Sequence, residues 1–273
     1  MRNRTSNIKR MSRTLLVLAA LWVCTPGAMA QTQRGDFDYD GHTNINDLAA
    51  LIEYLLDGQW DATPWVVRDT LTVNGVSFVM VHVDGGTISL GEGITGTVPD
   101  FCIGQTEVTQ ALWKAVMGSN PSWYQAYTDL PVEQVSWDDC QSFIQELNAL
   151  TGLNFRLPRS LEWTFAASGG NYSHGYTFAG SDNAALVAWY NTTSGGTNSQ
   201  RTKQLKPNEL GLYDMSGNVL EWCSDASQSN PGNRIVRGGD FNGSANRCRV
   251  FWSGDYNQKK GNRLNGVRLA LTL

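Results

Sequence analysis

The sequence has 273 residues and a formal net charge of −4, and 17% of its residues are charged. Acidic chains are poor partners for nucleic acids, whose phosphates are bound by clustered Lys and Arg side chains. Beyond residue 30, no segment approaches the roughly 18 consecutive apolar residues of a membrane-spanning helix. We therefore expect neither a nucleic-acid partner nor a membrane span.

Residues 1–30 have the three parts of a secretory signal peptide. An apolar run over 15–23 is followed by Ala28-Met29-Ala30, which supplies the small side chains of a cleavage site. A lipoprotein is less well supported, because bulky residues precede Cys24. We expect export to the periplasm, the cell surface or the surroundings, with Gln31 as the mature N-terminus and a net charge of −9 after cleavage. The basic start of the segment comprises Arg2, Arg4, Lys9, Arg10 and Arg13.

Residues 31–58 have the spacing of an EF-hand-like calcium loop followed by a helix. Gly41 allows the sharp turn of such a loop, and the apolar pattern over 48–56 predicts the helix. Clustered carboxylates repel one another unless a cation lies among them, so we expect calcium here. The alternative is a solvated acidic turn. The expected ligands are Asp36, Asp38, Asp40, His42 through its carbonyl, Asn44 and Asp47.

The same segment resembles one repeat of a type I dockerin, because Asp47 takes the last ligand position and a leucine-rich helix follows it. Dockerins carry two such repeats and bind cohesins. Only one copy occurs here, so the resemblance implies calcium binding and makes a cohesin-like protein one candidate partner. Residues 59–72 show no clear period and are predicted to be a linker.

A single α+β domain is predicted over residues 73–273. Apolar residues alternate over 76–81, and the turn Asp84-Gly85-Gly86 leads to a second strand over 88–90. This arrangement predicts a β-hairpin. Beyond Gly169, glycine-rich and asparagine-rich loops dominate.

Three helices are predicted between the hairpin and these loops. Thr109 caps the first, which ends near Gly118. The second starts with a capping box formed by Ser136 and Asp139. The third covers residues 161–167 and follows Pro158.

Four cysteines stay in the expected mature chain: Cys102, Cys140, Cys223 and Cys248. Export makes one or two disulfides chemically possible, and the sequence does not choose among the three pairings. Buried free thiols are the alternative.

Eight short phrases occur in this domain in the order found in one protein family. They are GQTEVTQ at 104–110, LPVEQVSWDD at 130–139, FRLP at 155–158, EW at 162–163, NELGLYDMSGNV at 208–219, EW at 221–222, VRGG at 236–239 and GVR at 266–268. Together they resemble the formylglycine-generating enzyme (sulfatase-modifying factor) family from about residue 73 to the C-terminus. The resemblance implies that family's fold, a C-type lectin-like variant with little regular secondary structure.

A second calcium ion is predicted at the phrase from Asp214 to Glu221. Two carboxylates and the main-chain oxygens around a glycine turn provide hard ligands on one short loop. The resemblance implies a structural calcium at the matching positions Asp214, Gly217, Val219 and Glu221. The alternative is a capped turn buried against Trp222.

Active family members oxidise a sulfatase cysteine to formylglycine with copper(I), which two thiolates hold. The first thiolate position matches Gly243, and the second matches Cys248 at best. One sulfur cannot complete a linear two-coordinate site, so we expect no copper and no oxidase activity. The three histidines, at positions 42, 82 and 174, are scattered and offer few bases for another catalytic centre.

The segment between Gly239 and Gly266 is predicted to bind a protein or glycan ligand. The resemblance extends to inactive family members, among them the variable proteins of diversity-generating retroelements, which carry a changeable ligand surface near the C-terminus. Aromatic faces beside amide groups suit such recognition. The alternative, that the asparagines form turns and the aromatics face the core, fits Phe251 best. The expected surface comprises Asp240, Phe241, Asn242, Asn246, Trp252, Asp255, Tyr256, Asn257 and Asn262.

These observations rank three functions. The first is an exported, non-catalytic ligand-binding protein on a lectin-like scaffold. The second is a cell-surface or polysaccharide-associated assembly component that uses the dockerin-like repeat. The third is an atypical formylglycine-generating oxidoreductase.

Overall fold

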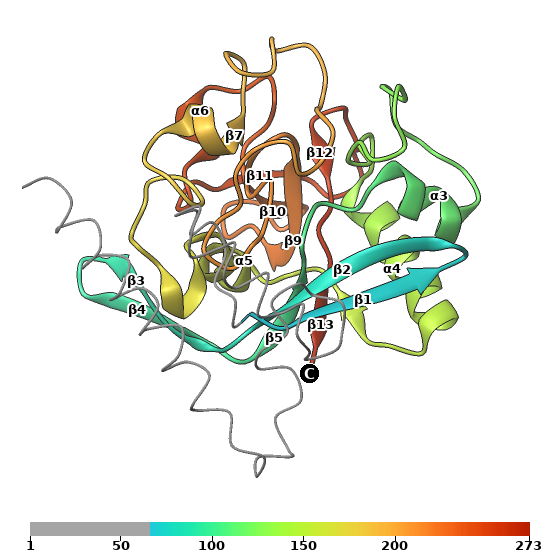
Figure 1. Ribbon diagram of the computed structural model, residues 1–273. Coiled ribbons are helices and arrows are strands. Elements are labelled where there is room, and N and C mark those ends of the chain that lie inside the picture. The colour runs from blue at the N-terminus through green and yellow to red at the C-terminus, as the bar shows by residue number, and fades with distance from the viewer. Residues whose placement is uncertain (1–65) are drawn as a thin grey trace, which may run out of the picture. The chain divides into compact units, whose positions relative to one another are not determined.

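The computed structural model describes residues 66–273. By its contacts the chain divides into two units, residues 1–60 and 61–273, and the described residues belong to the second. The predicted signal peptide, the calcium loop with its helix and residues 59–65 of the predicted linker lie outside the described residues. Figure 1 shows helices and strands mixed along the described chain, as expected for an α+β domain.

A five-stranded antiparallel sheet has the strand order β1-β2-β5-β13-β6. Its strands are β1 (Arg68–Val73), β2 (Val76–Val83), β5 (Phe101–Gly104), β13 (Ala270–Thr272) and β6 (Phe155–Arg156). The final strand of the chain therefore lies inside the sheet, between β5 and β6. This position ties the C-terminus to the first half of the domain.

The sheet separates two hydrophobic cores. Successive side chains of a strand point to opposite faces of its sheet. Met80 and Cys102 accordingly belong to the core that contains residues of α3 and α4, whereas Val81 and Ile103 belong to the core that contains residues of α5. Both faces of β2 and β5 are therefore buried.

The three predicted helices are confirmed as α3 (Gln110–Met117), α4 (Trp137–Thr151) and α5 (Ser160–Ala167). Thr109 Oγ1 accepts the Leu112 N–H at 3.2 Å and caps α3. In the capping box of α4, Ser136 Oγ accepts the Asp139 N–H at 3.1 Å and Asp139 Oδ2 accepts the Ser136 N–H at 2.9 Å. Within residues 66–273, no helix combines the length and apolar character that a bilayer crossing requires.

The prediction of a hairpin between residues 76–81 and 88–90 is wrong in its pairing. β2 pairs with β1, across a turn at Asn74 and Gly75, whose φ angles are 49° and 80°. Asn-Gly favours this tight turn, because both positions need positive φ. Residues 68–72 of the predicted linker thus form a strand, and the strand after residue 85, β3 (Gly86–Gly91), pairs instead with β4 (Ile94–Val98).

A second sheet lies in the region where the sequence predicted loops. Its order is β11-β10-β9-β12, and β12 runs parallel to β9. The strands are β9 (Leu220–Ala226), β10 (Asn233–Arg237), β11 (Gly254–Asn257) and β12 (Asn265–Gly266). The same half of the chain holds the 3-10 helices η1 (Gly170–Tyr172) and η2 (Ala245–Cys248), the short helix α6 (Ala184–Val187), and the parallel pair β7 (Ala188–Trp189) and β8 (Ser216–Gly217).

Candidate functional site

The predicted ligand-binding segment is fixed to the rest of the domain near both ends. A Cβ atom on Gly239, whose φ is 78°, would lie 2.8 Å from the carbonyl carbon of Arg247, so the chain needs glycine here. Arg237 joins the segment to α5, because its Nε donates to Ser160 Oγ at 2.9 Å and its Nη1 to the Trp252 carbonyl at 3.0 Å. The other end is β12, which is paired with β9.

The guanidinium group of Arg247 organises the middle of the segment. Its Nη2 atom lies 3.2 Å from Asp240 Oδ2 and donates to the Tyr256 hydroxyl at 3.0 Å. The guanidinium also lies 5.0 Å from the centroid of the Trp252 ring, within the range of a cation–π interaction. Arg247 thus connects η2 with two aromatic side chains on and beside β11. Sequence reasoning missed this residue, because a single arginine in a loop belongs to no motif.

Seven of the nine predicted surface residues are at least partly accessible. Trp252 and Tyr256 lie against the core that contains α3 and α4, so each has one buried side and one accessible side. The exposed residues are Asn242, Asn246 and Asn257, and the half-buried ones are Trp252, Asp255, Tyr256 and Asn262.

The other two residues, Asp240 and Phe241, do not lie on the surface, and their assignment to it is wrong. Their exposed fractions are 0% and 2%. Burial raises the pKa of Asp240, an effect that the nearby Arg247 opposes. The Phe241 N–H donates to the Asn218 carbonyl at 2.8 Å, which draws the ring inward. Phe251 shows the reverse error, because it was assigned to the core and is 55% exposed.

Three of the accessible polar residues already have partners within the chain. Asp255 accepts hydrogen bonds from the hydroxyls of Ser227 and Ser229 and from the Asn233 amide. These bonds lower the pKa of Asp255, and the bond from Ser227 has the largest effect. The side-chain oxygens of Asn257 and Asn262 accept main-chain N–H groups two residues ahead, at 3.0 and 2.8 Å. These two asparagines therefore form turns, as the alternative interpretation held.

The four cysteines of the described chain, at positions 102, 140, 223 and 248, are free and buried. Burial, together with the charge of Asp240, raises the pKa of Cys248 to about 12, so its thiol is protonated near neutral pH. A Cβ atom on Gly243 would lie 3.2 Å from Asp240 Oδ2 and 3.3 Å from Arg247 Cδ. The Asp240–Arg247 ion pair therefore occupies the space that a side chain at 243 would enter.

A buried charge cluster surrounds Arg268, whose side chain is fully buried. Its Nε and Nη2 atoms donate to both carboxylate oxygens of Glu221 at 2.7 to 3.0 Å, and the Trp163 indole N–H donates to Glu221 as well. Glu107 and Asp214 are the other carboxylates that interact electrostatically with Arg268. Glu107 and Arg268 belong to two of the eight sequence phrases, but their shared position could not be read from the sequence.

The predicted calcium ligands of the large domain differ in how well they fit a cation. Asp214 Oδ2 accepts the Lys203 N–H at 2.9 Å, whereas its Oδ1 is buried without a hydrogen-bond partner. Burial raises the pKa of Asp214 to about 6. The free oxygen and the surplus of buried carboxylates over guanidinium fit a cation, which Asp214 could hold with main-chain oxygens of Gly217 and Val219.

Glu221, the fourth predicted ligand, is already occupied by Arg268 and fits the cation less well. Within residues 66–273, no three or more His, Cys, Asp and Glu side chains are grouped as a metal site. A calcium ion at Asp214 is therefore a proposal that rests on one free carboxylate oxygen.

Three comparisons with known proteins agree on one family. The sulfatase-modifying factor enzyme 1-like domain matches residues 74–273. The chaperone protein LppX of Paenibacillus barcinonensis is 32% identical over 238 aligned residues, and the match covers 66% of this chain and 85% of that protein. The formylglycine-generating enzyme of Thermomonospora curvata is 31% identical over 166 residues, and the match covers 55% of this chain and 50% of that enzyme.

A solved structure agrees with the sequence comparisons. Variable protein 1 of Treponema denticola superposes with a TM-score of 0.69 at 29% identity, and the match covers 75% of this chain and 99% of that protein. The predicted C-type lectin-like variant of the formylglycine-generating enzyme fold is thereby confirmed. The chain belongs to the family of the sulfatase-modifying factor enzyme 1-like domain.

Proposed function

We propose that the chain is an exported, non-catalytic protein that binds a protein or glycan ligand through a surface near its C-terminus. We call this the Arg247 surface: Asn242, Asn246, Trp252, Tyr256 and Asn257, with Arg247 between them. It leaves out the buried residues Asp240 and Phe241, and also Asp255 and Asn262, which are half-buried and whose side chains are hydrogen-bonded within the chain.

The contacts of Arg247 carry the proposal. One guanidinium holds the Trp252 ring at 5.0 Å and the Tyr256 hydroxyl at 3.0 Å, and it is itself anchored by the buried Asp240 at 3.2 Å. Two aromatic side chains are thus fixed before a ligand arrives, which reduces the entropy lost on binding. Asn242 and Asn246 add exposed amides beside them. Rigid aromatic groups with polar neighbours are typical of recognition surfaces.

The position of Gly243 argues against oxidase chemistry. Copper(I) needs soft ligands, and this chain has a glycine at the first expected thiolate position. The space beside that glycine is filled by Asp240 and Arg247. The single matching thiol, Cys248, is buried with a raised pKa. The likeness to a Treponema denticola variable protein supports a binding role on this scaffold.

A binding screen with matched variants tests the proposal. Residues 31–273 are probed on glycan and bacterial-surface-protein arrays, first as the wild type. Arg247→Met should weaken binding to whatever the wild type selects by at least about tenfold, because it frees both aromatic side chains. The control carries Gln145→Ala and Glu146→Ala on the exposed face of α4 and should bind like the wild type. Equal binding by the Arg247→Met protein and the wild type would refute the proposal.

A further inference from the structure

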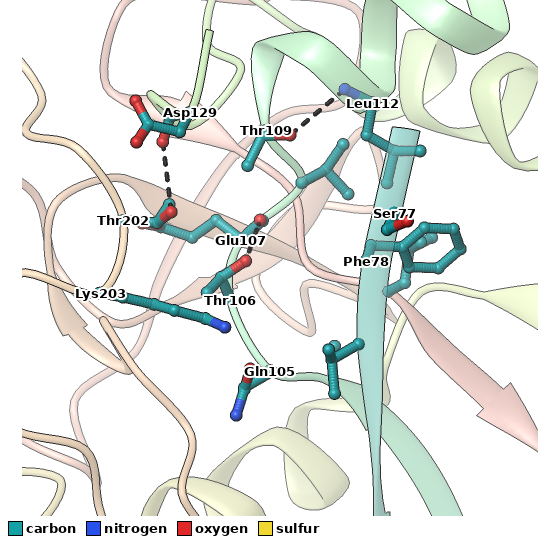
Figure 2. A pocket seen from close by; sticks show the side chains of 14 residues that line it. Ser77, Phe78, Gln105, Thr106, Glu107, Thr109, Leu112, Asp129, Thr202 and Lys203 are labelled. Carbon is teal, nitrogen blue, oxygen red and sulfur yellow. Dashed lines mark hydrogen bonds between the residues drawn. The ribbon is translucent and has the colours of Figure 1, made fainter. Parts of the chain in front are cut away.

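A cavity of about 400 Å³ lies away from the Arg247 surface, between β2, the segment before α3 and the loop around residue 202. Figure 2 shows it with its lining side chains. Its volume falls in the range of small-molecule sites, roughly 300–1,000 Å³. No function described above uses it. Its lining comprises Ser77, Phe78, Val79, Gly104, Gln105, Thr106, Glu107, Val108, Thr109, Leu112, Asp129, Thr202, Lys203 and Leu269.

The cavity has an apolar wall. Phe78 and Val79 come from β2, Val108 and Leu112 from the start of α3, and Leu269 from the residue before β13. Phe78 and Val79 are only partly buried, and as neighbours on one strand they point to opposite faces of the sheet. Phe78 packs against the core that contains α3 and α4, whereas Val79 packs against the core that contains α5. An apolar group of a ligand that covered this wall would gain free energy in proportion to the area removed from water.

The opposite part of the cavity is polar. Figure 2 shows the side chains of Lys203 and Gln105 projecting into it from two separate segments. The main chain of Gln105 is fixed, because its N–H donates to the Val79 carbonyl and its carbonyl accepts from Tyr213, both at 2.9 Å. Its carboxamide is thereby presented to the cavity. The Lys203 ammonium lies over the Tyr213 ring, 5.6 Å from its centroid.

The acidic groups of the lining do not compensate Lys203, since each is bound elsewhere. Both carboxylate oxygens of Asp129 accept from Arg201 Nε, Oδ1 at 3.0 Å and Oδ2 at 2.9 Å. The Glu107 oxygens accept from the Val219 N–H at 3.2 Å and from the Asn218 amide at 3.0 Å. Burial first, and the charge of Arg68 second, lower the pKa of Lys203, and the charge of Asp214 opposes them. Because burial removes water from the ammonium, an anion beside it would be stabilising.

We propose that this cavity binds a carboxylate joined to an apolar group. The carboxylate is placed on the Lys203 ammonium and the Gln105 carboxamide, and the apolar group rests on Val79, whose carbonyl is bonded to the Gln105 N–H. Charge-assisted hydrogen bonds of this kind are about twice as strong as neutral ones. The carboxylate can belong to a free small acid or to the end of a peptide chain, because both offer the same chemistry.

Calorimetric titration of the full mature chain tests the proposal with two pairs of probes. The first pair is 3-phenylpropionate and its neutral counterpart, 3-phenylpropionamide. The second is a hexapeptide ending in Phe with a free carboxylate, and the same peptide with an amidated end. In at least one pair the acid should bind. The amide of that pair should bind at least about tenfold more weakly than the acid, because it cannot form the charge-assisted hydrogen bond. The pair with the tighter acid identifies the source of the carboxylate.

Variants decide whether the cavity is responsible. Lys203→Met keeps the apolar stem and the backbone conformation, whose φ is 61°, and should weaken binding of the acid by at least about tenfold. Lys259→Met, which removes an exposed lysine away from the lining, is the matched control and should leave it unchanged. Thermal unfolding of each variant shows whether it is folded. The proposal fails if no acid binds the wild type, if acid and amide bind equally, or if folded Lys203→Met binds like the wild type.

Discussion

Arg268 shows how a single residue can support the centre of this domain. Its guanidinium is fully buried and is shared among Glu221, Glu107 and Asp214, with further bonds to the carbonyls of Gly104 and Tyr213 at 2.9 and 2.8 Å. A buried charge that loses its partner is not rehydrated, so its cost falls directly on the folded state. The GVR phrase is thus explained as a structural requirement of the fold.

Replacing Arg268 by Met should lower the free energy of unfolding by about 3–5 kcal/mol, because three buried carboxylates would lose their common cation. Urea unfolding monitored by Trp fluorescence measures the change. Arg201→Met provides the control, since the Arg201–Asp129 pair is about half exposed, with side-chain exposures of 49% and 40%. That variant should lose much less stability than Arg268→Met, because solvent screens an exposed ion pair. Similar losses of unfolding free energy in both variants would show that the buried Arg268 contributes no more to stability than the exposed Arg201.

Gly243 gives the second prediction for a single residue. Restoring a cysteine there should yield no formylglycine, because its Cβ atom would meet Asp240 Oδ2 at 3.2 Å and Arg247 Cδ at 3.3 Å. Mass spectrometry of a Cys-x-Pro-x-Arg peptide, incubated with the Gly243→Cys protein, copper(I) and oxygen, measures the conversion. The wild type and an active family enzyme serve as negative and positive controls. Time-dependent conversion by the variant would contradict the proposed inactivity.

At the scale of secondary-structure elements, variants on and beside β11 test whether its aromatic side chains serve core packing or ligand recognition. Trp252 and Tyr256 rest partly on the core, whereas the neighbouring Phe251 is 55% exposed. Trp252→Ala and Tyr256→Ala should each lower the free energy of unfolding by about 1–3 kcal/mol, less than full burial of such a ring would imply. Phe251→Ala should change it by at most about 0.5 kcal/mol. Thermal and urea unfolding measure all three.

The same variants bear on the Arg247 surface when they are assayed for binding. A folded Trp252→Ala or Tyr256→Ala protein should also lose affinity for the ligand that the arrays identify. Loss of stability with unchanged affinity would mean that these rings serve packing alone. Loss of affinity in Phe251→Ala alone would place recognition at Phe251 and not at the Arg247 surface.

Elements defined by local signals could be predicted from the sequence. Thr109, and the pair Ser136 and Asp139, fix helix starts through contacts within three residues, and these helices are where they were expected. The hairpin prediction used Asp84-Gly85-Gly86 as its turn and did not consider Asn74-Gly75, which joins the strands that pair. Strands β9 to β12 were missed. Of these, β11 and β12 have only four and two residues and pair with β10 and β9, which are distant from them in sequence.

The candidate site was predictable as a segment but not as a set of side chains. Phe241 stands between Asp240 and Asn242 and is buried, whereas Phe251 stands between Val250 and Trp252 and is exposed, so the local sequence gives the wrong expectation for both. The fold fixes Phe241 through contacts such as its main-chain bond to Asn218, which is distant in sequence. Arg247 was missed for the same reason, because its role depends on three partners brought together only by the fold.

In the molecule as a whole, the segment proposed for recognition is held at both ends by the second sheet and contributes β11 to it. The chain enters the segment from β10 and leaves it through β12, and both strands belong to the second sheet (Figure 1). The final strand, β13, then joins the five-stranded sheet between β5 and β6. Loops held at both ends by a rigid scaffold can change in sequence at little cost to the core.

Calcium is expected to act on the whole chain through two separable sites. The predicted loop over 36–47 lies outside the described residues, and the second position is the free oxygen of Asp214. A ligand that binds only the folded state raises its stability by mass action, by about 2.7 kcal/mol at a concentration 100 times its Kd. Calcium should therefore raise the melting temperature of the wild type.

The double variant Asp40→Ala, Asp47→Ala should bind less calcium in a calorimetric titration while residues 66–273 stay folded, because it removes two carboxylates of the loop alone. The variant Asp69→Ala, Glu146→Ala removes the same charge from exposed positions and should titrate like the wild type. Asp214→Asn, tested separately, should abolish the second phase of binding, because the amide keeps the shape of the side chain and removes the charge. An unchanged calcium titration in the loop variant would contradict the assignment of residues 36–47, whatever Asp214 does.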